Sequence, residues 1–299
     1  MDEPIGQKTM TNKTIGAHMS IAGGYHKALE RVAVLGGNCL QLFSTSPRGW
    51  NKTELTADAK KLFLETKKSL SIDPIFFHAS YLINLADDGR VGTQSKESLI
   101  HELNIASQLG IMGSIVHTGS FKGDTTIIWD VSQDKKYSVL INNISEVLTK
   151  TPSDTFLIIE NAGNHKIGQN LDEIASILND VDNERMKVCL DTCHLYSAGY
   201  DLSTREKFDA FMEEFERKIG LDRLVVIHTN DSRDPFDSGR DRHENIGAGT
   251  LGLGPFRILL GDKRTKDLPF IIEVPGFDGT GPDKRNIDIL RNLENETQG

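Results

Sequence analysis

The sequence has little of what stabilises secreted proteins or anchors membrane proteins. Three cysteines occur in 299 residues, and two of them lie inside strand-like runs. They cannot form a disulfide framework, so a reducing, cytoplasmic setting is expected. No run approaches the roughly 20 apolar residues of a membrane span, and no charged-then-apolar leader opens the chain. Residues 1–13 are polar and patternless, and we expect a loose N-terminal tail there.

Short apolar runs alternate with amphipathic stretches along the rest of the chain. Strands are predicted at residues 14–20, 39–45, 74–80, 113–119, 155–161, 187–193, 224–230 and 268–274. Helices are predicted at residues 24–36, 55–70, 95–109, 137–149, 171–178, 204–219, 255–260 and 282–293, with Ser95 as a candidate N-cap. Strands that alternate with helices imply parallel βαβ units. Eight units without a break in composition predict one closed (β/α)8 barrel, a TIM barrel, over residues 14–299.

Imidazoles and carboxylates gather at or just past the ends of the apolar runs. Nine of them are candidate metal ligands: His78, His117, Glu160, Asp191, His194, His228, Asp241, His243 and Glu273. A single buried histidine is more often structural than a ligand, but these residues follow six of the eight strands. An open, doubly wound sheet would place its site at one crevice, whereas a closed barrel brings all strand ends to one mouth. The pattern therefore predicts a polynuclear metal site at the carboxyl ends of barrel strands.

Two local motifs set conditions on this site. In an extended strand Asp191 and His194 would face opposite sides, so both reach one mouth only if the strand ends near Thr192. They would then serve different metals. Asp241 and His243 alone are typical of a surface turn, but beside His194 they form a His-Asp-His set suited to one zinc. The other four histidines are His18, His26, His101 and His165. Of these, only His18 also ends a strand, and it is a candidate for lining the pocket.

Several loop residues have both a structural and a functional interpretation. Gly247 and Gly249 suggest a phosphate cradle, although two glycines are weak evidence. Arg48, and Tyr81 in the segment 81–85, follow the second and third strands. Composition alone favours loop packing for them, and the alternative is contact with nucleic acid by wedging or stacking. Cys189 and Cys193 are spaced four apart and are expected to be buried packing residues rather than a zinc-thiolate pair.

The net charge of −9 speaks at first sight against nucleic acid. Four of the nine candidate ligands are acids, however, and three divalent ions would offset much of the negative charge. Net charge therefore does not decide the partner.

Long motifs around these ligands resemble the endonuclease IV family of apurinic/apyrimidinic endonucleases. They are the segments 78–86, 188–194, 228–232, 241–243 and 246–249, with an opening match at residues 16–20 and Gly23-Gly24. The match spans residues 15 to 290, and all nine ligand positions hold the expected residue type. Departures from the family pattern fall at Thr118, Arg233, Asp237, Val274 and the segment 161–165, and none removes a ligand.

The resemblance implies a trinuclear zinc centre, with partial replacement by manganese. The first metal would be held by His78, His117 and Glu160, the second by Glu160, Asp191, His228 and Glu273, and the third by His194, Asp241 and His243. Glu160 would be the catalytic residue, a bridging ligand that positions a metal-bound hydroxide. Arg48, Tyr81 and Leu82 match family positions that enter the duplex at the lesion.

The implied activity is hydrolysis of the phosphodiester 5′ to an abasic site in double-stranded DNA. It leaves a 3′-hydroxyl and a 5′-deoxyribose phosphate, and the protein is expected to be a monomer. An abasic site lacks the stacking that opposes extrusion, which gives selectivity. Two alternatives remain open: a metal-dependent sugar isomerase or epimerase on a similar barrel, and a DNA-binding or metal-storage protein without turnover. The His-Asp-His set disfavours the first, because such isomerases use mainly carboxylate-held ions.

Overall fold

Eight parallel strands form a closed barrel, as the sequence predicts. The computed structural model describes residues 13–124, 126–163 and 166–298. The barrel strands are β1 (Ile15–His18), β2 (Cys39–Phe43), β3 (Ile75–His78), β4 (Gly113–Val116), β5 (Phe156–Glu160), β6 (Met186–Asp191), β7 (Leu224–His228) and β10 (Phe270–Ile272). They follow one another around the ring in chain order, and β1 pairs with β10, with Ala17 opposite Ile272. The strands expected at eight positions are all present, each shorter than its predicted range.

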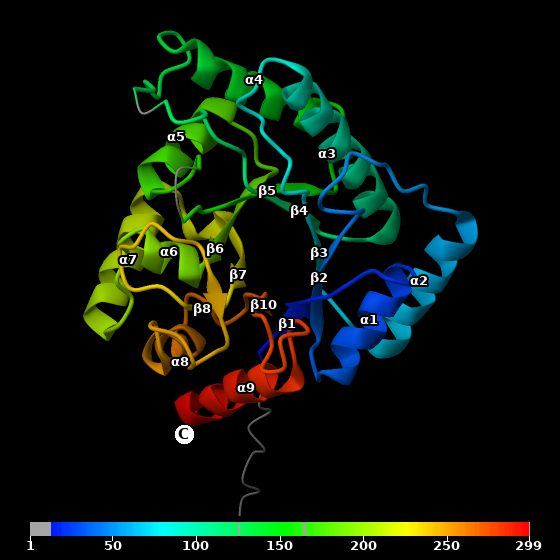
Figure 1. Cartoon of the computed structure of the whole chain (residues 1–299), viewed down its shortest axis with the longest axis vertical. Helices are drawn as coiled ribbons and strands as arrows, with labels where there is room; N and C mark the ends of the chain where they lie inside the picture. The colour runs from blue at the N-terminus through cyan, green and yellow to red at the C-terminus, as the bar shows by residue number, and fades with distance from the viewer. Residues whose placement is uncertain (1–12, 125, 164–165, 299) are drawn as a thin grey trace, which may run out of the picture.

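Helices surround the ring of strands (Figure 1). They are α1 (Tyr25–Val34), α2 (Ala57–Leu70), α3 (Arg90–Leu109), α4 (Lys135–Thr149), α5 (Leu171–Val181), α6 (Thr192–Ser197), α7 (Arg205–Lys218), α8 (Leu253–Gly261) and α9 (Lys284–Gln298), with a short 3-10 turn, η1 (Leu221–Arg223). Several begin at side-chain caps that satisfy free backbone amides. Asp134, for example, accepts hydrogen bonds from the amides of Lys136 and Tyr137 at the start of α4.

One predicted helix start is wrong. Helix α3 begins at Arg90 rather than at Ser95. Ser95 is fully buried inside the helix, where its hydroxyl donates to Val91 O at 2.7 Å and accepts from the amide of Asn84 at 2.9 Å. A serine that bonds back to the preceding turn satisfies its hydroxyl within the helix, so it need not mark a helix end.

The barrel interior contains an apolar layer and, above it, a polar layer. Alternate strand residues face inward. The apolar layer is a separate packed cluster of fully buried residues, Cys39, Phe76, Ile115, Ile158, Cys189, Val226 and Ile271. Two residues further along each strand come Gln41, His78, His117, Glu160, Asp191, His228 and Glu273. The strand period of two therefore delivers one polar side chain per strand to the carboxyl end of the barrel.

Strand β1 completes both layers with Gly16 and His18. A Cβ atom at Gly16 would lie 1.9 Å from the carbonyl oxygen of Cys39, so β1 and β2 approach too closely for a side chain there. Two residues later, His18 joins the polar layer, as the sequence suggested for a residue lining the pocket.

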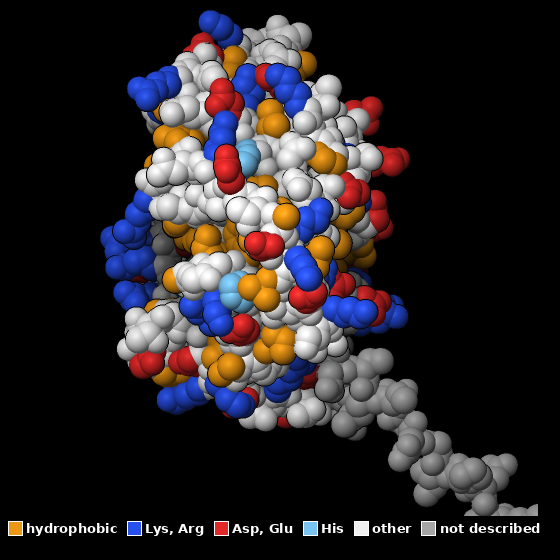
Figure 2. All heavy atoms as spheres, turned by 90° about the vertical axis from the view of Figure 1, so that its right-hand side faces the viewer, with side chains coloured by type: hydrophobic (Ala, Val, Ile, Leu, Met, Phe, Trp, Pro, Cys, Tyr) orange, Lys and Arg blue, Asp and Glu red, His pale blue; other side chains and the backbone are white. Residues whose placement is uncertain are grey.

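The outer surface has mixed charge. Figure 2 shows the side that faces right in Figure 1, where acidic and basic side chains are interspersed over most of the view, with Lys and Arg gathered along its left-hand edge. In the described part of the chain, no helix combines the length and apolarity needed to cross a bilayer. The expected tail at residues 1–13 lies, apart from Lys13, outside the described residues.

Candidate metal centre

The structure brings all nine candidate ligands to one mouth of the barrel. Their ligand atoms form groups in which every atom lies within 4.8 Å of the others, namely His78, His117 and Glu160; Glu160, Asp191, His228 and Glu273; and His194, Asp241 and His243. Glu160 belongs to the first two groups. The cavity above them, about 350 Å³ in volume, is also lined by His18, Phe43, Tyr81, Lys166 and Pro282.

The first group places two imidazoles against one oxygen of Glu160. Nε2 of His78 and Nε2 of His117 each lie 3.3 Å from Glu160 Oε2. The other ring nitrogen of His78 lies 2.8 Å from the carbonyl oxygen of Ala79, which orients Nε2 toward the group. Burial, and to a smaller extent the nearby Lys166 ammonium, lowers the pKa of His117 to about 3. His117 is therefore neutral near pH 7 and offers a lone pair.

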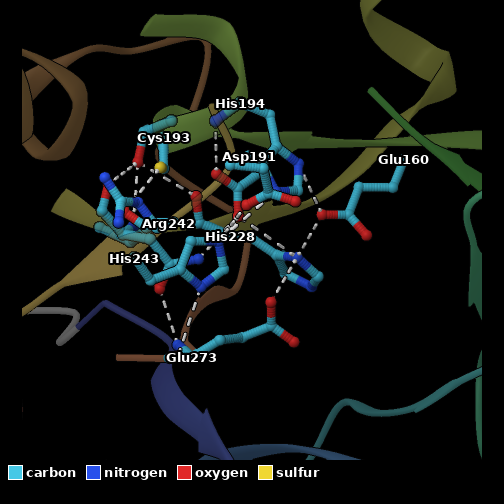
Figure 3. A network of polar contacts seen from close by, with 12 residues as sticks. Glu160, Asp191, Cys193, His194, His228, Arg242, His243 and Glu273 are labelled. Atoms are coloured by element: carbon cyan, nitrogen blue, oxygen red, sulfur yellow. Dashed lines mark hydrogen bonds and ion pairs between the residues drawn. The ribbon is translucent and has the colours of Figure 1, made fainter. Parts of the chain in front are cut away.

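In the second group the imidazole of His228 lies between carboxylates (Figure 3). Its Nδ1 is 3.1 Å from Glu160 Oε1, 3.4 Å from Glu273 Oε2 and 3.8 Å from Asp191 Oδ2. Burial favours the neutral acid, yet the His228 imidazole and hydrogen bonds from His194 and His228 hold the pKa of Glu160 well below its usual range. The two oxygens of Glu160 thus face different groups, as a bridging ligand requires.

The third group forms because strand β6 ends near Thr192, which is the condition that the sequence set for Asp191 and His194 to reach the same mouth. The strand stops at Asp191, and helix α6 begins at Thr192. Asp191 Oδ1 caps this helix by accepting from the amide of His194 at 3.0 Å, while Oδ2 faces the second group. Nε2 of His194 lies 2.9 Å from Asp241 Oδ1, and Nε2 of His243 lies 3.5 Å from the same oxygen. Asp191 and His194 therefore serve different groups.

Asp241 and His243 belong to a short hairpin that the hydrophobic periodicity of the sequence did not predict. Strands β8 (Asp231–Ser232) and β9 (His243–Glu244) form a small antiparallel hairpin outside the barrel. A two-residue strand is too short to give a periodic pattern, so neither it nor α6 was predicted.

The glycines after this hairpin do not cradle a phosphate. The amides of Gly247 and Gly249 donate to Asp231 Oδ2 at 2.9 and 3.1 Å, and the Leu251 amide donates to Oδ1 at 3.0 Å. A Cβ atom at Gly249 would lie 2.3 Å from the carbonyl oxygen of Ser232. These glycines let the loop close around the Asp231 carboxylate, and their amides are already engaged.

The donor set fits divalent metal ions. Every ion pair made by the four carboxylates of the groups is with a histidine, as far as the described residues show. The four carboxylates, at 0–32% side-chain exposure, converge with five imidazoles at one place. Mixed imidazole and carboxylate groups of this kind suit zinc and its first-row neighbours.

The cysteines pack rather than react. All three are buried and free. Burial raises the pKa of Cys189 and of Cys193 to about 12, so both remain thiols near pH 7. Although Cys193 lies close to Asp191 and His243, its thiol donates to the carbonyl oxygen of Arg242 at 3.6 Å.

Two asparagines that the sequence did not single out orient the ligands. Nδ2 of Asn230 donates to Asp191 Oδ2 at 2.6 Å, and its Oδ1 accepts from the amide of Glu273 at 2.7 Å. Oδ1 of Asn161 accepts from the amide of Asp191 at 2.6 Å. Asn161 directly follows Glu160, and Asn230 lies two residues after His228. This closeness to a predicted ligand is the sequence signal that could have identified them.

Gln41 and Lys166 are further site residues that the sequence did not reveal. Gln41 is the β2 member of the polar layer, and its place two residues after the inward-facing Cys39 is the signal for it. Lys166 is exposed, lines the mouth beside His117, and forms no ion pair with any described residue. Its loop position carries no periodic signal.

The candidate DNA-contacting residues lie beside the mouth. Tyr81 is 65% and Leu82 38% exposed, and Arg48 is exposed on the loop after β2. The Ser80 hydroxyl donates to the carbonyl oxygen of Pro47 at 2.8 Å, which ties the two loops together. The Tyr81 ring packs edge-on against Phe43, with centroids 5.4 Å apart.

The remaining histidines lie apart from the ligand groups or beyond the described residues. His26 is on α1, and His101 on α3 contacts the carbonyl oxygen of Thr53 at 2.9 Å. His165, with Asn164 in the departing segment, lies outside the described residues.

The chain is similar to known nucleases over nearly its whole length. A family model described as a xylose isomerase-like TIM barrel matches residues 29–293. A probable endonuclease 4 from Persephonella marina is 35% identical over 283 residues, covering 93% of this chain and 96% of the relative. Endonuclease IV from Thermus thermophilus superposes with a TM-score of 0.82 at 32% identity, covering 95% and 99% of the two chains.

A second solved structure, at lower sequence identity, shares only the fold. The structure of a D-tagatose 3-epimerase-like protein aligns with a TM-score of 0.68 at 17% identity, covering 95% of this chain and 98% of that one.

Proposed function

Because the chain belongs to the endonuclease IV family and is therefore a nuclease, we propose that it cleaves double-stranded DNA at abasic sites. It would hydrolyse the phosphodiester 5′ to the abasic sugar and leave a 3′-hydroxyl and a 5′-deoxyribose phosphate. The observation that carries this proposal is the set of three ligand groups, the first two of which share Glu160, at one open mouth. We further propose that residues 14–299 act as a single barrel domain, as a monomer in the cytoplasm.

The described residues would hold three divalent ions, zinc foremost, with manganese able to replace part of it. Bound ions would supply an activated water and neutralise charge on the phosphate. Glu160 fixes the spacing of the first two groups, because its Oε2 faces His78 and its Oε1 faces His228. His194 and Asp241, 2.9 Å apart, would hold the third ion together with His243.

The rim of the mouth supplies groups for DNA. Tyr81 and Leu82 present apolar surface next to the ligand groups, as residues that fill a gap in a base stack must do. Arg48, which acts electrostatically on Tyr81, and Lys166, which lines the cavity, add positive charge near the mouth, which suits DNA phosphates. The −9 net charge therefore does not describe the surface that DNA would meet.

The sugar epimerase alternative is less well supported. The barrels of that activity are below 25% identity and share only the fold. The third ligand group, with His194, Asp241 and His243, has no purpose in an isomerisation that needs mainly carboxylate-held ions. A binding or storage protein without turnover would not need a mouth that leaves the groups accessible to a 350 Å³ cavity.

The test combines elemental analysis of gently purified protein with a nicking assay. A duplex with one abasic site and a labelled strand is compared with the same duplex intact. We expect about three divalent ions per chain and a single cut 5′ to the lesion with a 3′-hydroxyl end. Cleavage that persists after chelation, a 3′-aldehyde product, or no cleavage by the fully loaded protein would overturn the proposal. Epimerisation of a ketose by the same sample would favour the alternative.

A further inference from the structure

Gln41 is the only carboxamide in the polar layer of the barrel, within the described strands, and it is fully buried. We infer that Gln41 is a positioning residue that orients two ligands of the second metal group, His228 and Glu273. This inference rests on the proposed metal-dependent function and extends it to a residue that the sequence did not single out.

The first contact sets which nitrogen of His228 faces the metal group. His228 Nε2 lies 2.6 Å from Gln41 Oε1. An amide oxygen only accepts hydrogen bonds, so Nε2 must carry the proton. A neutral imidazole has a single N–H, which leaves the lone pair on Nδ1. That nitrogen faces Glu160, Glu273 and Asp191.

The second contact fixes the amide itself. Gln41 Nε2 donates to Glu273 Oε1, and it lies 2.8 Å from Nδ1 of His18. An ionised carboxylate only accepts, so the amide nitrogen must point toward Glu273 and the oxygen toward His228.

The same contact orients Glu273. Its Oε1 is occupied by Gln41 and by His18, whose Nδ1 lies 3.3 Å away. Its other oxygen, Oε2, is left facing His228 Nδ1 at 3.4 Å. One amide therefore turns both ligands toward the same ion. Hydrogen-bonding partners of metal ligands typically change metal affinity by about 10–100-fold when they are removed.

A purely structural role would have different partners. The residues on either side, Leu40 and Leu42, face the helices and are fully buried. An apolar side chain at position 41 would extend the packing of Cys39 without any need for hydrogen bonds. The amide instead accepts from His228 and donates to Glu273, among the described residues, with its nitrogen 2.8 Å from His18 Nδ1, and each of these three residues lies in the polar layer.

The test is the variant Gln41→Met, which keeps the side-chain length but removes the donor and acceptor. The matched control is Gln108→Met, because Gln108 is an exposed glutamine whose amide donates to Asn104 O at 3.2 Å. Zinc affinity is measured by competition with a chromophoric chelator, and the melting temperature is measured on metal-free protein. We expect one of the three ions to bind about 10–100-fold more weakly in Gln41→Met and all three to bind normally in the control.

The outcomes separate this inference from the proposed function. Equal zinc affinity in wild type and Gln41→Met, or a uniform loss over all three ions with a lower melting temperature of the metal-free protein, overturns the role of Gln41. Failure of the wild type to bind zinc overturns the metal centre instead. An independent readout uses ¹⁵N-edited NMR of the zinc-loaded wild type. Protonated Nε2 on His228 is expected, and protonated Nδ1 would contradict the inference even if the variant does not fold.

Discussion

Asp241 Oδ1 lies 2.9 Å from His194 Nε2, so a loop carboxylate contacts an imidazole in the first turn of α6. The backbone of His194 is itself fixed by the cap from Asp191, and its Nδ1 lies 2.9 Å from Asn161 O. A rigid imidazole thus meets an acid carried by the β8–β9 hairpin, and Asp241, at 32% side-chain exposure, is the most exposed of the four carboxylates.

Asp241→Ala should release one of three divalent ions and leave the other two bound. The hairpin residue is outside the barrel, so the fold should persist. Elemental analysis after gel filtration measures the ion count, and circular dichroism checks the fold. Asp237→Asn is the control, because Asp237 is exposed in the same loop and has φ 56°, a conformation that asparagine tolerates. Retention of three ions by Asp241→Ala would remove Asp241 from the ligand set.

Glu160→Gln should abolish cleavage of abasic DNA while the barrel stays folded. The amide cannot supply two negatively charged oxygens to the two groups that Glu160 joins, so the activated water loses its place. The nicking rate should fall by at least about a hundredfold, as for removal of a key electrostatic group. Near-normal turnover in a variant that holds its full metal complement would exclude Glu160 from the centre of the mechanism.

The double variant Arg48→Ala, Tyr81→Ala should lose discrimination between abasic and intact duplex. A stacking contact is worth about 1–3 kcal/mol per base, so the affinity ratio should fall roughly tenfold or more. Gel shifts with the two duplexes at one salt concentration measure the ratio. Metal content should not change. Equal weakening of both complexes, with a lower melting temperature, would show that these residues only pack the loops.

Lys166→Gln should weaken DNA binding in a salt-dependent way. If the ammonium contacts one phosphate, the slope of log affinity against log salt should decrease by about one. Binding isotherms from about 50 to 200 mM salt give the slope. Lys61→Gln on the outer face of α2 is the control, because Lys61 is exposed and paired with Glu65. A slope that does not differ from wild type or from this control would place Lys166 away from the DNA backbone.

Glu102 should make the protein less stable at alkaline than at acidic pH. Burial raises the pKa of this carboxyl to about 7, despite hydrogen bonds from Ser114 and Ser44. The unfolded chain has a pKa of about 4.3, so the folded state binds more protons between these values. Stability therefore falls as pH rises from about 4 to about 7, and the loss is complete above the folded-state value.

Glu102→Gln removes this ionisation, so its melting temperature should decline less than that of wild type between pH 5 and pH 8. Glu97→Gln, an exposed change on the same helix, is the control and should follow the wild type. An equal decline in all three proteins would mean that Glu102 does not titrate in this range.

The sequence predicts the barrel well because its buried strands are short, continuous apolar runs that stand out from the amphipathic helices between them. Six of the eight strands place a ligand type two residues after an apolar inward residue, as with Ile158 and Glu160, so the sequence indicates both the strand and its functional end. The ends of helices and strands are harder to predict from the sequence. Ser95 has the chemistry of a cap, yet α3 continues through it because its hydroxyl bonds to Val91 O.

The rest of the site depends on contacts between distant segments. Gln41 has no local feature that separates it from a packing residue, and only the meeting of β2 with His228 and Glu273 gives it partners. From the sequence alone, Gly247 and Gly249 could form a phosphate-binding loop. Nothing in the sequence shows that their amides donate hydrogen bonds to Asp231 instead. Tertiary hydrogen bonds decide both cases.

The strand that closes the barrel also supplies part of the metal centre. Strand β10 pairs with β1, and Glu273 follows it directly. The second ligand group needs Glu273 together with residues from β5, β6 and β7. A chain still emerging from the ribosome, or one opened at the seam between β1 and β10, therefore holds an incomplete set of ligands. The full ligand set of the second group therefore exists only in the closed ring of strands.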